Sequence, residues 1–143
     1  MHLLIAADHA GFELKEHLKK WLEANGHTHE DFGTHSTDSM DYPDVVHPMA
    51  KRVNIAPDNY KGILICGSGN GVCMTANKYP QVRAALVWNP ELATLARQHN
   101  NANILCLPAR FISPEVAEAC VKAFVETAFE GGRHLNRVKK IKP

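Results

Sequence analysis

A cysteine followed by alternating glycines is the segment with the clearest capacity for chemistry. Cys66 ends the apolar run at residues 62–66, and Gly67-Ser68-Gly69-Asn70-Gly71 follows at once. Glycines between a buried strand and a helix leave backbone N–H groups free to bind an anion. The pattern is neither a Walker A loop, which needs Gly-Lys-Ser/Thr, nor the dinucleotide fingerprint. Beside such a loop a cysteine can be a base or a nucleophile, whereas a buried cysteine elsewhere usually only fills the core.

Two histidines could take part in proton transfer. Asp8 and His9 follow the first apolar run, and an acid next to a histidine can orient or protonate a substrate oxygen. His99 continues the apolar stripe of an amphipathic segment, where a histidine is often a core residue. A helix C-terminus also favours the imidazolium, and we expect His99 and Asn100 to open toward the carboxyl ends of the strands.

Three arginines could hold a dianion such as a phosphate ester. Arg133 and Arg137 are four residues apart and share one face of a short basic helix, and Arg110 follows the last apolar run. The competing interpretation is a solvated basic tail. A metal site is not favoured at His27-x-His29, because no third ligand is placed beside the pair.

Short apolar runs alternate with amphipathic segments along the whole chain, which predicts a β-α-β-α-β-α-β-α-β-α order. The predicted strands cover residues 3–7, 27–32, 62–66, 82–87 and 103–107. The predicted helices cover residues 12–25, 44–54, about 70–78, 90–99, the segment from 114 to Gly131, and about 132–141, the last one basic. Alternating units predict a doubly wound parallel sheet that binds ligands beyond the carboxyl ends of its strands.

The composition predicts one domain over residues 1–143, with 16 Lys and Arg against 15 Asp and Glu. This balance disfavours a general nucleic-acid binder, because it creates no strong field of one sign. Neither a signal peptide nor an apolar stretch of about 18 residues is found, so we expect a cytoplasmic protein without a membrane contact. The four cysteines lack a C-x-x-C pair and are expected to be free thiols.

Six motifs carry a resemblance to a known family. They are Ala7-Asp8-His9-Ala10-Gly11 with Leu14-Lys15, Asp41-Tyr42-Pro43-Asp44, Ile65-Cys66-Gly67-Ser68-Gly69-Asn70-Gly71, Ala76-Asn77-Lys78, Arg97-Gln98-His99-Asn100-x-Ala102-Asn103, and Glu130-Gly131-Gly132-Arg133-His134-x-x-Arg137. In this order, and over essentially the whole chain, they resemble the type B ribose-5-phosphate isomerases of the ribose/galactose isomerase family.

The resemblance implies a Rossmann-like, three-layer α/β/α sandwich with a five-stranded parallel sheet. It also implies a homodimer, or a tetramer, with active sites at the subunit interface. The implied reaction is the interconversion of D-ribose 5-phosphate and D-ribulose 5-phosphate through an enediolate, in the non-oxidative pentose phosphate pathway. No metal or other cofactor is implied.

The family's functional residues match positions of this chain. By resemblance, Cys66 would move the proton between C1 and C2, and His99, helped by Asp8, would open the sugar ring. The other implied substrate contacts are the loop residues Gly67, Ser68, Gly69, Asn70 and Gly71, the sugar ligand Asn100, and the phosphate ligands His9, Arg110, Arg133 and Arg137.

One departure within the family is informative. Some members have glycine in place of the cysteine and a glutamate just after the loop, whereas this chain has Cys66 and Val72. It therefore resembles the group that uses a cysteine base. Two other functions remain open: an isomerase of allose 6-phosphate or galactose 6-phosphate, and a non-catalytic module that binds sugar phosphates.

Overall fold

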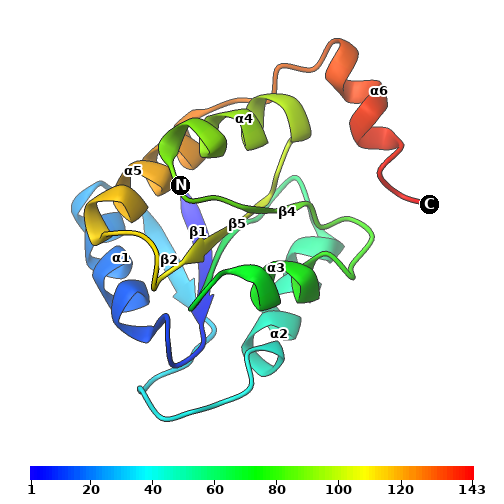
Figure 1. The fold of residues 1–143 in the computed structure, drawn as a ribbon. Coiled ribbons are helices and arrows are strands. Elements are labelled where there is room, and N and C mark those ends of the chain that lie inside the picture. The colour runs from blue at the N-terminus through cyan, green and yellow to red at the C-terminus, as the bar shows by residue number, and fades with distance from the viewer.

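The computed structural model describes residues 1–143 and contains a five-stranded sheet in the order β2-β1-β3-β5-β4 (Figure 1). The strands are β1 (His2–Ala7), β2 (Thr28–Asp31), β3 (Lys61–Cys66), β4 (Ala84–Leu86) and β5 (Ile104–Pro108). All four pairings are parallel. The continuous apolar runs of β1, β3 and β5 are explained by their position in the middle of the sheet, where helices cover both faces.

Helices form a layer on each face of the sheet. The helices are α1 (Phe12–Ala24), α2 (Pro43–Ile55), α3 (Asn70–Ala76), α4 (Pro90–Asn100), α5 (Pro114–Glu126) and α6 (Arg133–Lys139). One core cluster of 18 buried residues joins α1, α4 and α5 to the sheet, and a second of 14 joins α2 and α3 to the opposite face. The predicted three-layer α/β/α sandwich is therefore confirmed.

Side chains decide where several elements begin and end. Ser113 accepts a hydrogen bond from the N–H of Val116 at 3.1 Å, which confirms it as the predicted cap of α5. Helix α3 stops two residues earlier than predicted. Both backbone groups of Ala84 pair with the side-chain amide of Asn77, each at 2.9 Å, and this pairing ties the end of the helix to the start of β4.

The inner face of α4 differs from the sequence prediction. The buried residues are Ala93, Ala96 and Arg97, whereas Leu95 is 36% exposed and the His99 side chain 38% exposed. Arg97 can be buried because its guanidinium donates to the carbonyls of Ala102 and Thr127, at 2.6 and 3.1 Å. The predicted apolar stripe ending at His99 was wrong, because the side chains of Leu95 and His99 are both more than a third exposed.

Helix α6 projects from the end of the domain, and α4 is the main element on which it packs (Figure 1). Its one buried residue is His134, and Arg133 and Arg137 are exposed. The basic helix is therefore attached to the domain mainly through α4. No helix combines the length and the apolar character needed to cross a bilayer.

Candidate active site

Three strands end side by side and place Asp8, Cys66 and Arg110 at their carboxyl-terminal ends, which we call the carboxyl edge of the sheet. The register pairs Ala7 with Ile65 and Cys66 with Pro108, so the carboxyl ends of β1, β3 and β5 are level. The N–H of Asp8 donates to the carbonyl of Ile65 at 3.2 Å, and that of Arg110 to the carbonyl of Gly67 at 3.0 Å. This edge is the binding edge expected of a doubly wound sheet.

The glycine loop wraps around the sulfur of Cys66. Cys66 is 5% exposed, and the N–H of Gly69 donates to its Sγ at 3.2 Å. Gly69 has φ +77°, a conformation that glycine adopts without strain, and this turn aims its N–H at the sulfur. This hydrogen bond holds the sulfur at the glycine loop, next to the backbone donors of residues 67–71. The arrangement therefore suits a cysteine that accepts and returns a proton.

Asp8 and the Arg110 side chain lie next to this loop. Asp8 is 7% exposed, and its Oδ1 accepts from the N–H groups of Ala10 and Gly11 at 3.0 and 3.1 Å. These bonds fix the carboxylate and leave Oδ2 available to a hydroxyl group. A Cβ built on Gly67 would lie 3.1 Å from Nη1 of Arg110, so the guanidinium lies over the loop. Ser68 and Asn70 are exposed at the same edge.

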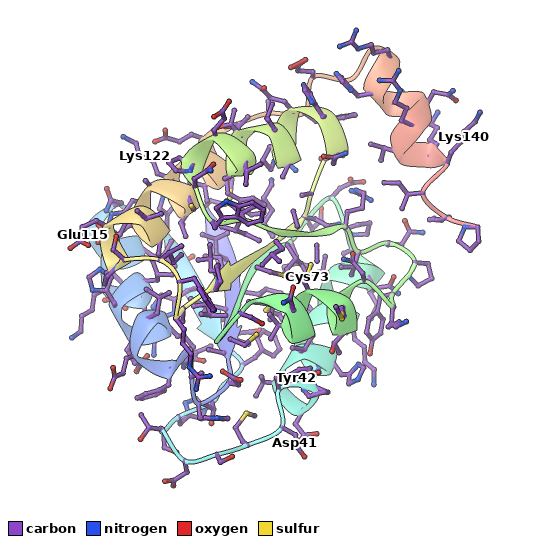
Figure 2. All side chains as sticks on the ribbon, viewed as in Figure 1. Asp41, Tyr42, Cys73, Glu115, Lys122 and Lys140 are labelled. Carbon is purple, nitrogen blue, oxygen red and sulfur yellow. The ribbon has the colours of Figure 1, made fainter.

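The segment between β2 and α2 closes one side of the edge. The N–H of Met40 donates to Nδ1 of His9 at 3.2 Å. The ring of Tyr42 lies against Gly71 so closely that a Cβ there would come within 2.5 Å of it. Figure 2 shows Tyr42 close to α3, the helix that follows the glycine loop. Tyr42 stands in one of the six motifs, but its residue type and spacing alone did not predict this contact.

A buried ion pair holds the start of this segment. Lys15 is fully buried and donates to Asp31, which also accepts from Lys19 at 2.9 Å and from the N–H of Gly33 at 2.8 Å. Burial alone would raise the pKa of Asp31, but the two ammonium groups and the Gly33 N–H outweigh it and hold this pKa below its usual value. The charged carboxylate thus fixes the chain where it leaves β2.

His99 and Asn100 lie near the amino-terminal ends of the strands, whereas Cys66 lies at a carboxyl-terminal end. Helix α4 starts beyond the carboxyl end of β4 and runs back, so its last residues precede β5, and the Asn103 carbonyl there accepts from the N–H of Gly62 at the start of β3. The expectation that His99 and Asn100 open toward the carboxyl edge was wrong. A helix that follows a parallel strand returns the chain to the amino edge.

Arg133 and Arg137 lie with His99 rather than with Arg110. They belong to α6, which packs on the end of α4. Figure 2 shows the separation, with Tyr42 at one end of the molecule and Lys140, just after α6, at the other. One chain therefore does not bring the predicted site residues together, but divides them into a carboxyl-edge cluster and an α4–α6 cluster. The carboxyl-edge cluster is Asp8, His9, residues 66–71 and Arg110; the α4–α6 cluster is His99, Asn100, Arg133 and Arg137.

Two residues next to the α4–α6 cluster, Glu130 and His134, were not assigned roles from the sequence. Glu130 lies 3.8 Å from His99 and 3.9 Å from His134, measured between carboxylate oxygens and Nε2 atoms. The side-chain ligand atoms of these three residues lie within 4.8 Å of one another. The two imidazole rings are stacked with only 13° between their planes, so the in-plane lone pairs do not converge on one point. This geometry does not favour a metal ion.

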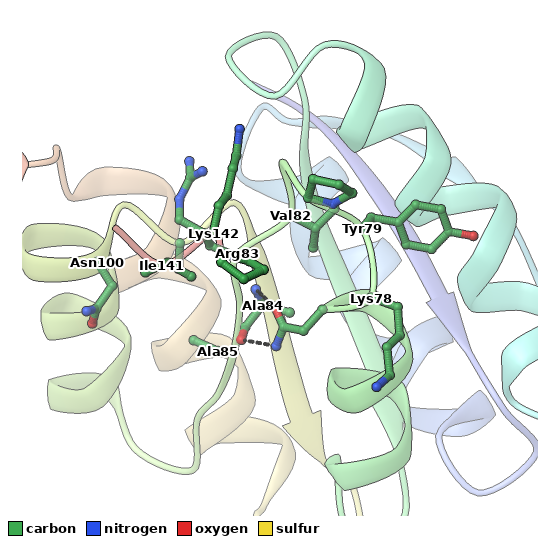
Figure 3. A pocket seen from close by; sticks show the side chains of 13 residues that line it. Lys78, Tyr79, Val82, Arg83, Ala84, Ala85, Asn100, Ile141 and Lys142 are labelled. Carbon is green, nitrogen blue, oxygen red and sulfur yellow. Dashed lines mark hydrogen bonds between the residues drawn. The ribbon is translucent and has the colours of Figure 1, made fainter. Parts of the chain in front are cut away.

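A hollow of about 790 Å³ separates the C-terminal segment from β4 and α3 (Figure 3). Asn100, Ile141 and Lys142 lie on one side of it, and Lys78, Tyr79 and Arg83 line other parts. None of the carboxyl-edge cluster lines it. This hollow therefore lies beside the α4–α6 cluster and along the free edge of the sheet at β4.

Known proteins match the chain over nearly its whole length. The family described as Ribose/Galactose Isomerase matches residues 3–141. A probable ribose-5-phosphate isomerase B of Mycoplasma pneumoniae is 47% identical over 97% of this chain and 91% of its own length. The crystal structure of a ribose 5-phosphate isomerase from Thermotoga maritima has a TM-score of 0.94 and 47% identity, covering 99% of this chain and 97% of that one.

A third relative carries a ligand. The crystal structure of ribose-5-phosphate isomerase B from Mycoplasma genitalium, with bound ribulose 5-phosphate, has a TM-score of 0.94 and 44% identity, covering 98% of this chain and 93% of that one. Such identity over whole chains goes far beyond a shared fold, and it agrees with the cysteine and glycine loop at the carboxyl edge. The chain belongs to the ribose/galactose isomerase family.

Proposed function

We propose that this protein is a ribose-5-phosphate isomerase that interconverts D-ribose 5-phosphate and D-ribulose 5-phosphate. Relatives of 44 to 47% identity carry this name, and one of them is solved with ribulose 5-phosphate bound. The observation that carries the proposal is the position of Cys66, whose sulfur lies under the N–H of Gly69 at the carboxyl edge. An aldose–ketose isomerase needs a base and nearby donors for an oxyanion, and this edge offers both.

Proton transfer is assigned to Cys66. The thiolate takes the proton from C2 of the open-chain aldose, and the electron pair moves into a C1–C2 double bond as negative charge develops on O1. Amides of residues 67–71 stabilise this enediolate, and preorganised donors of this kind typically contribute about 3 to 4 kcal/mol each. Cys66 then returns the proton to C1, while the proton of the O2 hydroxyl passes to O1, which gives the ketose.

Ring opening and phosphate binding are assigned to residues of both clusters. His99 donates a proton to the ring oxygen, and the fixed carboxylate of Asp8 accepts the hydroxyl proton of C1. Ser68 and Asn100 bind sugar hydroxyls. The phosphate is held by His9 and Arg110 of the carboxyl-edge cluster and by Arg133 and Arg137 of the α4–α6 cluster, whose guanidinium groups can each bind two phosphate oxygens.

In one chain the two clusters lie at opposite ends of the parallel strands. We therefore assign each active site to residues from two copies of the chain. One copy supplies Asp8, Cys66 and Arg110, and the other supplies His99 and Arg137. The projecting α6, the free edge at β4 and the 54% exposed Trp88 next to it support a homodimer. An apolar side chain of this size at an open sheet edge is typical of a surface that is covered in the assembly.

The substrate is tested first. The purified protein, treated with EDTA, is assayed on ribose 5-phosphate beside allose 6-phosphate and galactose 6-phosphate. We expect turnover of the pentose phosphate to exceed that of both hexose phosphates. Turnover of a hexose phosphate alone would make the protein a six-carbon isomerase, and no turnover of any of the three would favour the sugar-phosphate binding module.

The base is tested by Cys66→Ala, which should lower kcat by roughly 10² to 10⁴ and change KM little, because general-base catalysis contributes about this factor. Cys73→Ala is the matched control, since Cys73 is a half-buried thiol on neighbouring α3. We expect the control to keep most of its activity. A Cys66→Ala variant as active as this control would remove Cys66 as the base.

The division of the site between two copies is tested by mixing two inactive variants. In a mixed dimer of Cys66→Ala and His99→Asn chains, one site has both residues intact and the other has neither. Co-refolding equal amounts should restore about a quarter of the parent activity, because half of the dimers are mixed and each has one working site. A mixture no more active than its two components would place each site within one chain.

A further inference from the structure

The ring of His99 is covered on one face by a second histidine. The rings of His99 and His134 stack with their centroids 4.2 Å apart and 13° between their planes. His134 belongs to α6 and is 7% exposed, whereas the His99 side chain is 38% exposed. One face of His99 thus rests on a buried partner, and the ring remains open to a substrate or to a second copy.

Glu130 completes this contact. Its Oε1 lies 3.8 Å from Nε2 of His99, and its Oε2 lies 3.9 Å from Nε2 of His134. Its backbone N–H donates to the carbonyl of Gln98 at 3.1 Å, which fixes Glu130 at the end of α4. The carboxylate is therefore placed between the ring nitrogens of both histidines, within reach of whichever one carries a positive charge.

The surrounding charges favour a neutral His134. Its pKa is lowered by partial burial and by His99, Arg133 and Arg137, and Glu130 opposes this effect. These are the titratable groups that act on His134 from α4, from α6 and from the segment between α5 and α6. Two parallel imidazolium rings at 4.2 Å would repel each other, whereas a neutral ring can stack on a charged one. A neutral His134 therefore stacks on His99 without charge repulsion between the two rings.

We propose that His134 is a positioning residue, which sets the ring plane of His99 for proton donation to the sugar ring oxygen while Glu130 faces both imidazoles. This proposal rests on the function proposed above. Nothing in it requires His134 to touch the reacting atoms. Its effect should therefore be confined to ring opening, because the later proton transfer by Cys66 needs no contribution from His99.

The test compares a cyclic substrate with an acyclic one. Ribose 5-phosphate closes into a furanose, whereas D-erythrose 4-phosphate cannot, because its O4 carries the phosphate. We expect His134→Ala to lower kcat on ribose 5-phosphate about tenfold or more, since a misplacement of about 1 Å can cost up to 10²-fold. On erythrose 4-phosphate the same variant should stay within about twofold of the parent, and His134→Phe, which keeps a flat ring in place, should recover most of the loss.

Two controls separate a positioning effect from general damage. Asn136→Ala changes an exposed residue of the same helix and should leave both substrates unaffected. The ring-current shift of the His99 proton signals, measured by NMR, should disappear in His134→Ala and remain in His134→Phe. This signal does not depend on activity.

Equal losses on both substrates in His134→Ala, or no recovery in His134→Phe with an intact ring-current shift, would overturn the positioning role. Failure of the proposed function gives a different result. In that case His99→Asn itself would lower turnover of ribose 5-phosphate and erythrose 4-phosphate by the same factor, whatever the His134 variants do.

Discussion

Gly69→Ala is the substitution whose effect can be worked out most fully from the structure. Two independent costs meet at this residue. Its φ of +77° lies in the left-handed region, where a residue with a Cβ costs about 1 to 2 kcal/mol. The new Cβ would also overlap Cδ1 of Leu86 and lie 3.3 Å from the backbone carbonyl carbon of Leu107. Overpacking of this kind costs about 1 to 3 kcal/mol.

Together these costs predict that Gly69→Ala lowers the free energy of unfolding by about 2 to 5 kcal/mol. Gly26→Ala is the matched control, because Gly26 has φ +80° and nothing lies within 4 Å of its Cβ position. The control should lose only the conformational part, about 1 to 2 kcal/mol. Urea unfolding at one fixed protein concentration measures both variants.

Leu86→Ala provides the second half of the test. It removes the atom that the new Cβ would overlap, so Gly69→Ala should cost less in this background, close to the cost of Gly26→Ala. Activity should also fall at least tenfold in Gly69→Ala, because the N–H at the Cys66 sulfur moves with the loop. A cost no greater than that of Gly26→Ala, or one unchanged by Leu86→Ala, would refute the packing argument.

Three further predictions concern charge and reactivity. Arg137→Ala should raise KM for ribose 5-phosphate by roughly 10- to 100-fold, because a charged hydrogen bond to the phosphate is lost. Lys139→Ala on the same helix should not raise KM. Equal KM values for Arg137→Ala and the parent would exclude Arg137 from the phosphate site. The pKa of Asp31 is lowered in the fold, so the charged carboxylate stabilises the folded protein fully above its unfolded pKa of about 3.9, and this stabilisation is lost as the pH falls through the folded pKa. The difference in unfolding free energy between the parent and Asp31→Asn should therefore shrink below about pH 4. A difference that stays constant with pH would contradict this. Burial raises the pKa of Cys120 to about 11, so iodoacetamide at pH 8 should label Cys73 well before Cys120. Peptide mass spectrometry measures the two labelling rates. Comparable rates would contradict the burial of Cys120.

Much of the fold could be predicted because it depends on local pattern. The apolar runs at β1, β3 and β5 and the period of α1 and α5 placed these elements within a few residues. The boundaries of α3 and β4 could not be predicted, because the pairing of Asn77 with Ala84 joins residues that no periodicity relates. One signal was present and not used: Lys15 falls among Leu14, Leu18 and Leu22 on the buried face of α1, which indicates a buried charge with a partner.

The position of His99 shows where reasoning from spacing alone failed. The alternating strand and helix order already implies that α4 runs back toward the amino edge, so the error lay in following the residue types rather than the chain direction. Dividing the predicted site between two edges in turn makes the implied homodimer a requirement of the proposed mechanism. The resemblance implied active sites at a subunit interface, but it did not say which of the predicted site residues each subunit supplies.

The sequence by itself determined the alternating α/β order, the glycine loop after Cys66 and the family, because these depend on residue type, short spacing and motif order. Only the tertiary structure decided that Lys15 pairs with Asp31, that Tyr42 covers Gly71 and that His134 stacks on His99. Each of these contacts joins separate elements. Their geometry follows from how the elements pack around the sheet, and no pattern along the chain specifies the angle or distance at which two such surfaces meet.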